Sequence, residues 1–236
     1  MILTEEKIQE IENASVGEAL KLVAEWFPGK VVFSSSLGQE DQVITDIIYK
    51  SNLPVKIFTI DTGRLFNETY ELLDRTFARY KQPIQVFFPE AADVEAFVLN
   101  KGINSFYESV DNRKECCYIR KVKPLNRALK GASVWVTGLR ADQSDNRKGM
   151  PVMEWSEEKQ LYKLNPLLHW GYDEVLDYLK EWNVPYNPLH DKGFISIGCA
   201  PCTRAIEPGE DARAGRWWWE ASHKECGLHE KTGVSK

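Results

Sequence analysis

The amino-acid sequence predicts a doubly wound α/β fold with a mainly parallel sheet and flanking helices. Three observations predict it: short apolar runs alternate with amphipathic segments, the alternation reaches about residue 195, and polar loops follow several of the runs. Strands that alternate with helices of this length favour a parallel sheet covered by helices on both faces. A length of 236 residues allows one large domain or two small ones.

The expected elements follow one another along the chain. Residues 4–26 show the periodicity of two amphipathic helices, with Asn13 and Ser15 as candidate caps between them. Strands are expected at 31–33, 55–60, 84–88 and 134–136, and helices at 41–49, 67–80, 93–100 and 117–129. Proline and glycine are frequent after residue 195, so we expect a loop-rich tail there.

Composition excludes several classes of protein. The 30 Lys+Arg against 35 Asp+Glu give a net charge of -5, which argues against a nucleic-acid-binding protein. No secretory signal pattern and no apolar run of about 20 residues is visible, so we expect a cytoplasmic protein without a membrane partner. The five cysteines are an odd number and cannot all pair within one chain. We therefore expect reduced or metal-bound thiols.

Polar loops follow three of the expected strands. The first contains Ser34, Ser35, Ser36, Gly38 and Asp41, the second spans 61–65, and the third runs from Gly138 to Arg147. Because ligands of such sheets bind beyond the carboxyl ends of the strands, we expect the three loops to form one site.

The chemistry of these loops favours a small anion. A Ser/Gly loop before a helix presents N–H groups and hydroxyls at a positive helix end, although such residues also serve simply as a turn and a cap. Arg140 and Arg147 offer planar forks for oxyanions. Residues 113–130 hold seven basic residues and one acidic residue, which fits a cationic site or a solvated basic helix.

Four of the cysteines fall into two pairs. Cys116 and Cys117 are adjacent, and Cys199 and Cys202 form a C-x-x-C motif. Four thiolates suffice for tetrahedral zinc or for an iron–sulfur cluster, and the spacing alone does not decide between them. The alternative is a pair of buried thiols beside a redox-active C-x-x-C.

The fifth cysteine, Cys226, has a different environment in the sequence. It lies in the expected tail between Lys224 and His229, with no neighbouring cysteine. A thiol near positive groups in an exposed segment is a candidate nucleophile, and the alternative is an incidental surface thiol.

Taken together, these segments resemble the assimilatory adenylyl-sulfate (APS) reductases of the APS/PAPS reductase family. The resemblance runs from Ser34 to His229 and is carried by SSSLGQED, IDTGRLF, CCYIRKVKPL, GLRADQS, GCAPCTR, RAGRWWW and KECGLH. It implies an adenine nucleotide alpha-hydrolase-like fold related to the ATP pyrophosphatases, with the phosphate loop modified. Residues 1–205 would form the nucleotide-binding reductase domain with the Fe–S site, and 206–236 a mobile tail that carries the nucleophile.

The resemblance also implies cofactor, partners and mechanism. A [4Fe–4S] cluster would be held by Cys116, Cys117, Cys199 and Cys202. Cys226 would attack the sulfur of adenosine 5′-phosphosulfate, release AMP and become S-sulfocysteine, from which thioredoxin or a glutaredoxin-like dithiol would release sulfite. The expected catalytic residues besides Cys226 are Lys121 and His229. The expected substrate contacts are Ser34, Ser35, Ser36, Gly38, Asp41, Ile60, Asp61, Thr62, Gly63, Arg64, Leu65, Gly138, Arg140, Arg147, Arg213 and Arg216.

Three other functions remain alternatives. The first is a 3′-phosphoadenylyl-sulfate (PAPS) reductase or an enzyme of dual specificity, which shares the nucleophile. The second is an ATP pyrophosphatase-type thiolation enzyme with a zinc Cys₄ site, whose phosphate loop would be richer in glycine. The third is a non-catalytic nucleotide- or metal-binding module. The oligomeric state stays open, and a homo-oligomer is compatible with the sequence.

Overall fold

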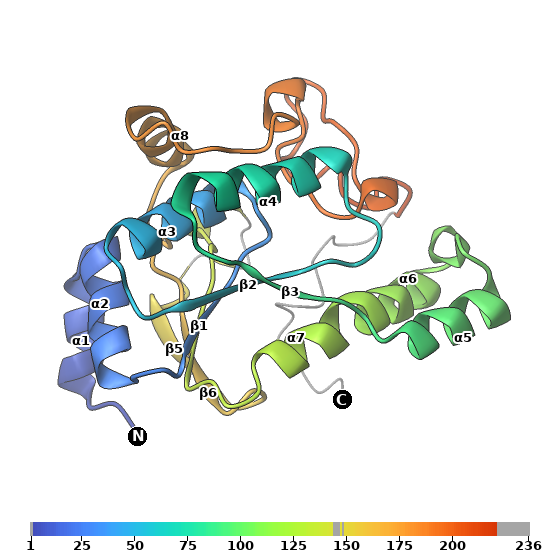
Figure 1. Ribbon diagram of the computed structural model, residues 1–236. Helices are drawn as coiled ribbons and strands as arrows, with labels where there is room; N and C mark the ends of the chain where they lie inside the picture. The colour runs from blue at the N-terminus through green and yellow to red at the C-terminus, as the bar shows by residue number, and fades with distance from the viewer. Residues whose placement is uncertain (1, 144–146, 148, 221–236) are drawn as a thin grey trace. The chain divides into compact units, whose positions relative to one another are not determined.

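The computed structural model describes residues 2–143, 147 and 149–220 (Figure 1). The chain divides into two compact units, each made of three segments. The first comprises residues 1–59, 67–85 and 129–188, and the second comprises 60–66, 86–128 and 189–236. In the described residues, no helix has both the length and the apolar character needed to cross a membrane.

Two helices open the first unit, as expected. Helix α1 spans Glu5–Asn13 and helix α2 spans Val16–Trp26. Ser15 begins α2 with a capping box: its hydroxyl accepts from the Glu18 N–H, and the Glu18 carboxylate accepts from the Ser15 N–H over 3.0 Å. This reciprocal pairing satisfies two backbone donors at the helix start, which is why the cap could be read from the sequence.

A six-stranded, mostly parallel sheet confirms the predicted fold class. The strands are β1 (Val31–Ser34), β2 (Lys56–Ile60), β3 (Gln85–Phe87), β4 (Val134–Val136), β5 (Met153–Ser156) and β6 (Leu161–Leu164), in the order β3-β2-β1-β4-β6-β5. Strand β1 pairs in parallel with β2 and β4, and β4 pairs in parallel with β6. Strand β5 is antiparallel to β6 at the edge.

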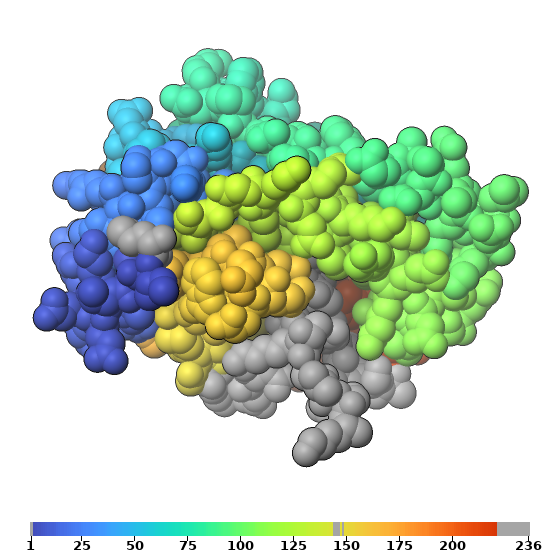
Figure 2. All heavy atoms as spheres, turned by 90° about the horizontal axis from the view of Figure 1, so that it is seen from below, coloured from blue at the N-terminus to red at the C-terminus, as the bar shows by residue number. Residues whose placement is uncertain are grey.

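The β5–β6 hairpin was not foreseen. Leu161–Leu164 is buried throughout, so it lacks the alternation that marks a half-buried strand. Figure 2 shows part of this stretch (yellow) at the surface beside the N-terminal helices (blue), and α1 packs against β5. Helix α8 (Tyr172–Glu181) was also missed, and it packs against α3 (Gln39–Lys50).

The main core lies in the first unit. Figure 1 shows α3 and α4 (Asn67–Tyr80) running over the strands. Phe33 of β1, Ile44 of α3 and Leu164 of β6 are fully buried in this core. The apolar strands thus give a rigid platform whose carboxyl ends carry the polar loops.

The second unit consists mainly of helices and loops. It contains α5 (Ala91–Lys101), α6 (Val110–Cys117) and α7 (Lys123–Ala128), with a π-helical turn over Tyr118–Val122 between the last two. The expected helix at 117–129 therefore begins too late and misses the π turn. The start at Val110 is polar, without an apolar stripe, and is marked only by the Ser109 side chain accepting from the Asn112 N–H.

The expected boundary at residue 205 does not separate the two units. Residues 206–220 belong to the second unit with Cys199 and Cys202, and Trp217 among them is fully buried. Its backbone N–H donates to the Cys202 carbonyl. The remainder of the expected tail, with Cys226 and His229, lies outside the described residues.

Candidate functional site

The serine loop after β1 is closed by Asp41. The Ser36 backbone N–H and hydroxyl both donate to Asp41 Oδ2 over 2.6 Å, and the Leu37 N–H donates to Ser35 Oγ over 3.1 Å. Leu37 has a positive φ of 61°, so the loop turns sharply before Gly38 starts α3. The loop therefore has a defined shape without a ligand.

The Asp41 carboxyl is buried and its charge is poorly solvated. Burial raises its pKa to about 6, even though the two donors on Ser36 act in the opposite direction. Asp41 was expected to contact the substrate, and in the structure its carboxylate shapes the loop that would do so. The third loop lies directly against it: a side-chain Cβ at Gly138 would come within 2.1 Å of Asp41 Oδ1.

The third loop brings two buried arginines toward the first. Arg140 donates from Nε to Glu40 over 2.9 Å and from Nη1 to Asp142 over 2.6 Å. Gln143 donates to the same Glu40 oxygen and accepts from Arg147. The structure thus gathers Arg140 and Arg147 beside the serine loop, with Glu40 and Gln143 between them. The sequence did not predict that Glu40 and Gln143 would hold the two arginines, because no pattern in the neighbouring residues indicates these contacts.

Strand β4 adds another residue that was missed. Trp135 is buried and donates its indole N–H to Ser34 Oγ over 2.7 Å. Within the first unit, residues 34–41 thus form one polar cluster with residues 138–143 and Arg147. Two of the three loops that the sequence predicts to share a site therefore lie together.

The second expected loop belongs to the other unit and contacts the cysteine segment. Thr62 Oγ1 lies 3.2 Å from Cys199 Sγ, and the Thr62 carbonyl accepts from Arg120 over 2.7 Å. The Gly63 N–H donates to Asp61 Oδ1, and the Arg64 carbonyl accepts from the Ala200 N–H. Ile60 and Leu65, also expected as substrate contacts, are half-buried in the same stretch.

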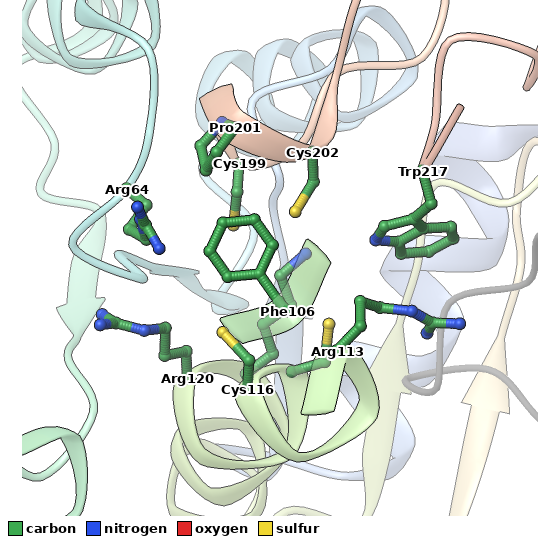
Figure 3. Close-up of a pocket in the computed structure, with 11 residues that line it drawn as sticks. Arg64, Phe106, Arg113, Cys116, Arg120, Cys199, Pro201, Cys202 and Trp217 are labelled. Carbon is green, nitrogen blue, oxygen red and sulfur yellow. The ribbon is translucent and has the colours of Figure 1, made fainter. Parts of the chain in front are cut away.

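All four paired cysteines line one cavity (Figure 3). Cys116 and Cys117 come from the end of α6, while Cys199 immediately precedes the 3₁₀ turn Ala200–Cys202 and Cys202 is its last residue. The cavity encloses about 350 Å³ of space, part of it open to solvent. All four thiols are free of disulfides. Two segments more than 80 positions apart are thus brought together around one space.

Cations surround these thiols. The cavity is lined by Arg64, Arg113, Arg120 and Lys121, and none of its described lining residues is acidic. Arg113 precedes Cys116 by three residues and Arg120 follows it by four, so helical periodicity could have placed both on the cysteine face. Lys121, expected from the resemblance, lines the same cavity.

The cavity affects its thiols differently. Burial raises the pKa of Cys202 to about 12, and burial also raises the pKa of Cys116. Burial acts in the same direction on Cys199, but the Lys121 ammonium and the Thr62 hydroxyl outweigh it, so the pKa of Cys199 is lowered. Cys199 is therefore better prepared than Cys116 or Cys202 to act as an anionic ligand.

The segment after the C-x-x-C motif completes this unit. Arg216 is buried against Gly198, where a Cβ would come within 2.3 Å of its guanidinium, and it donates to Ser196 Oγ over 3.2 Å. Arg213 lies one turn earlier, where its carbonyl accepts from the Arg216 N–H. The expected substrate contacts Arg213 and Arg216 thus belong to the cysteine unit.

Comparison with known proteins places the chain in a family. The family model of the phosphoadenosine phosphosulfate reductase domain matches residues 30–205. The protein belongs to this family.

Several relatives carry a narrower name. The adenosine 5′-phosphosulfate reductase of Rhizobium meliloti (strain 1021) is 50% identical over 220 residues, covering 93% of this chain and 83% of the relative. That of Agrobacterium fabrum (strain C58 / ATCC 33970) is 52% identical over 202 residues, covering 85% of this chain and 78% of the relative.

Solved structures support the fold. The phosphate complex of phosphoadenylyl-sulfate (PAPS) reductase from Candida auris has a TM-score of 0.74 at 31% identity, covering 86% of this chain and 99% of that one. Candida glabrata FMN adenylyltransferase with FAD and inorganic pyrophosphate has a TM-score of 0.55 at 16% identity, covering 100% of this chain and 82% of that one. The latter likeness concerns the fold alone.

Proposed function

We propose that the protein reduces adenosine 5′-phosphosulfate to sulfite and AMP. The observation that carries the proposal is the cavity lined by four cysteines and four cations, in a chain about half identical to reductases of that name. A sulfate sulfur is shielded by anionic oxygens, so a thiolate approaches it only where cations offset the repulsion. The cations that line the cavity supply such charge in the second unit.

The reaction uses the thiol of Cys226. Its sulfur forms a bond to the sulfate sulfur while the bond from that sulfur to the phosphate oxygen breaks, and AMP leaves with the electron pair. The enzyme then carries S-sulfocysteine. A dithiol such as thioredoxin or a glutaredoxin-like protein attacks the Cys226 sulfur, displaces sulfite, and is oxidised to its disulfide as Cys226 returns to the thiol. The dithiol supplies both electrons.

The polar cluster of the first unit is proposed to bind the phosphosulfate. The Ser34 hydroxyl and the N-terminus of α3 after Gly38 suit anionic oxygens. Arg140 is held by Glu40 and by Asp142, which is half exposed. An oxyanion of the substrate is expected to displace Asp142 from this arginine while Glu40 keeps it in place.

The four cysteines are proposed to hold a [4Fe–4S] cluster. Among the described residues, no three His, Cys, Asp or Glu side chains converge around a single ion. Four thiols placed around a shared cavity fit a group of four irons, which takes one thiolate at each iron, better than they fit one tetrahedral zinc. When bound, the cluster supplies fixed charge and structural rigidity. Arg120 and Lys121 line the same cavity. We propose that their positive charges orient toward the cluster.

A second substrate is supported by a separate observation. Both the family model and the Candida auris structure carry the name of a 3′-phosphorylated substrate. Steady-state rates with the two nucleotides separate the candidates. A higher kcat/KM for the 3′-phosphorylated form would replace the proposed substrate with PAPS.

Mass spectrometry tests the mechanism directly. After incubation with adenosine 5′-phosphosulfate and no thiol, we expect one SO₃ adduct on the peptide that contains Cys226. Cys226→Ser should show no adduct and no sulfite release, while its affinity for AMP is unchanged. An adduct on another cysteine, or turnover by the variant, would overturn the assignment. Added thioredoxin should remove the adduct and release sulfite.

A further inference from the structure

A buried ion pair joins helix α6 to the last described residue. Arg113 donates from Nε and Nη2 to the two carboxylate oxygens of Glu220, each over 2.9 Å. The two side chains are only 4% and 3% exposed. Removing two charges from water is costly, and this parallel two-bond geometry is the arrangement that compensates it best. Such a pair holds together two segments separated by 107 positions.

The same guanidinium contacts the cysteine cavity. Arg113 and Cys117 both line the cavity, and they lie four positions apart on the same face of α6. Its guanidinium carbon lies 4.5 Å from the centre of the Trp217 ring, and Figure 3 shows the side chain extending beneath that ring. A guanidinium is a rigid planar group that only donates. The guanidinium that holds Glu220 thus belongs to a residue that lines the cavity beside Cys117.

Glu220 ends the segment that covers this side of the cavity. Trp217 is 1% exposed, its N–H donates to the Cys202 carbonyl, and the Glu220 N–H donates to the Trp217 carbonyl. The buried Trp217 ring and the ion pair of Glu220 attach this segment to the unit, and the Trp219 ring packs against Tyr107. Cys226 follows a few residues later in the chain.

We propose that Arg113 is a positioning residue that couples occupancy of the four-cysteine site to the docking of residues 217–220. A cysteine that holds a metal is an anion at a fixed place, and a Cys117 thiolate would attract the Arg113 guanidinium one helical turn away. An empty site lacks this fixed anion and holds Arg113 less firmly. Because coupling between two sites is reciprocal, a firmly held Glu220 also favours the occupied site. The effect on Cys226 rests on the proposed function, but the coupling does not.

Chymotrypsin cleavage after Trp217 measures the docking, because this buried ring must leave its place before the protease can bind it. The full chain is prepared anaerobically with iron, and cleavage is followed by intact-mass spectrometry. Glu220→Gln should be cleaved at least about tenfold faster than wild type, since it leaves Arg113 buried and unpaired. The matched control is Glu210→Gln, which removes the equally bidentate but exposed pair with Arg204 in the same unit. It should stay within about twofold of wild type.

Removing the iron tests the coupling itself. Chelation should accelerate cleavage of the wild type by about tenfold, but cleavage of Glu220→Gln by less than about threefold. Arg113→Lys keeps the charge, loses the fork and should behave like Glu220→Gln, and it serves as the variant if Glu220→Gln does not fold. Equal cleavage of the two glutamine variants would overturn the proposal. So would chelation that accelerates wild type and Glu220→Gln equally, or that leaves the wild type unchanged.

A single-turnover experiment extends the test to the reaction. Glu220→Gln should slow adduct formation on Cys226 about tenfold while the affinity for AMP stays unchanged, which loss of folded protein alone would not produce. An adduct rate equal to that of wild type would overturn the positioning role. If wild type itself forms no adduct, the proposed function fails, and the cleavage data still decide whether the coupling exists.

Discussion

The Trp135 indole N–H donates to the Ser34 hydroxyl oxygen over 2.7 Å. An indole N–H can only donate, so Ser34 Oγ accepts this bond and its own proton is directed elsewhere. The Ser34 hydroxyl is thereby prepared to donate to an anionic oxygen. Trp135 of β4 thus determines that the Ser34 hydroxyl accepts from the sheet and donates on its other side.

Replacing Trp135 by Phe should weaken substrate binding. The side chain stays aromatic, but one hydrogen bond is lost and the smaller ring leaves buried space unfilled. We therefore expect KM for the nucleotide to rise about fivefold, while the free energy of unfolding falls by about 2 kcal/mol. Steady-state kinetics and urea unfolding check both values. In a Ser34→Ala background the same change should have no further effect on KM. An additive effect would show that the bond to Ser34 is irrelevant.

The stability of the protein should depend on pH through Asp41. The pKa of Asp41 is 3.8 in its ordinary state and about 6 when folded, so the folded protein binds more protons than the unfolded chain between these values. Stability from this group is therefore fully present below about pH 4 and is lost as the pH rises through about 6. Asp41→Asn removes this dependence.

Urea unfolding of wild type and Asp41→Asn gives the measurement. Between about pH 5 and about pH 7.5, wild type should lose about 1 kcal/mol of unfolding free energy relative to the variant. A difference that does not change over this range would show that Asp41 titrates normally in the folded state.

Gly138→Ala should disturb both loops of the first unit. The added Cβ would meet Asp41 Oδ1 at 2.1 Å and Glu40 Cβ at 3.3 Å, so the loops must move apart. We expect a loss of about 2 kcal/mol in unfolding free energy and a lower affinity for AMP. Gly131 has a positive φ of 83°, and a Cβ added there would meet no atom within 4 Å. Gly131→Ala therefore serves as a control that introduces backbone strain without a steric clash. Equal nucleotide affinity in the two variants would argue against close loop packing.

Iron content should distinguish the paired cysteines from the fifth. Cys199→Ser should lose most of the iron, about four atoms per chain, and show a lower Tm, since the remaining thiols cannot complete the site. Cys226→Ser should retain the iron and the Tm of wild type. Zinc in place of iron in an anaerobic preparation would refute the cluster and favour a single-ion site.

Local signals in the sequence predicted much of the fold. The capping box at Ser15 and the apolar runs of β1, β2 and β4 follow from the chemistry of a few neighbouring residues. The β5–β6 hairpin and the start of α6 were missed because their evidence is not local. Leu161–Leu164 is identified as a strand by its pairing with β4, and the polar start of α6 has no apolar stripe.

The sequence by itself determined the alternating α/β order, the serine loop and the two cysteine pairs, because periodicity, small-residue turns and short spacings are visible within a few residues. Only the tertiary structure decided which side chains meet. It placed Thr62 against Cys199, paired Arg113 with Glu220, and engaged Arg140 with Glu40. Each of these contacts joins residues 100 or more positions apart, so no local pattern records it. The physical reason is that desolvation and ion pairing depend on neighbours in space, which the folded chain alone supplies.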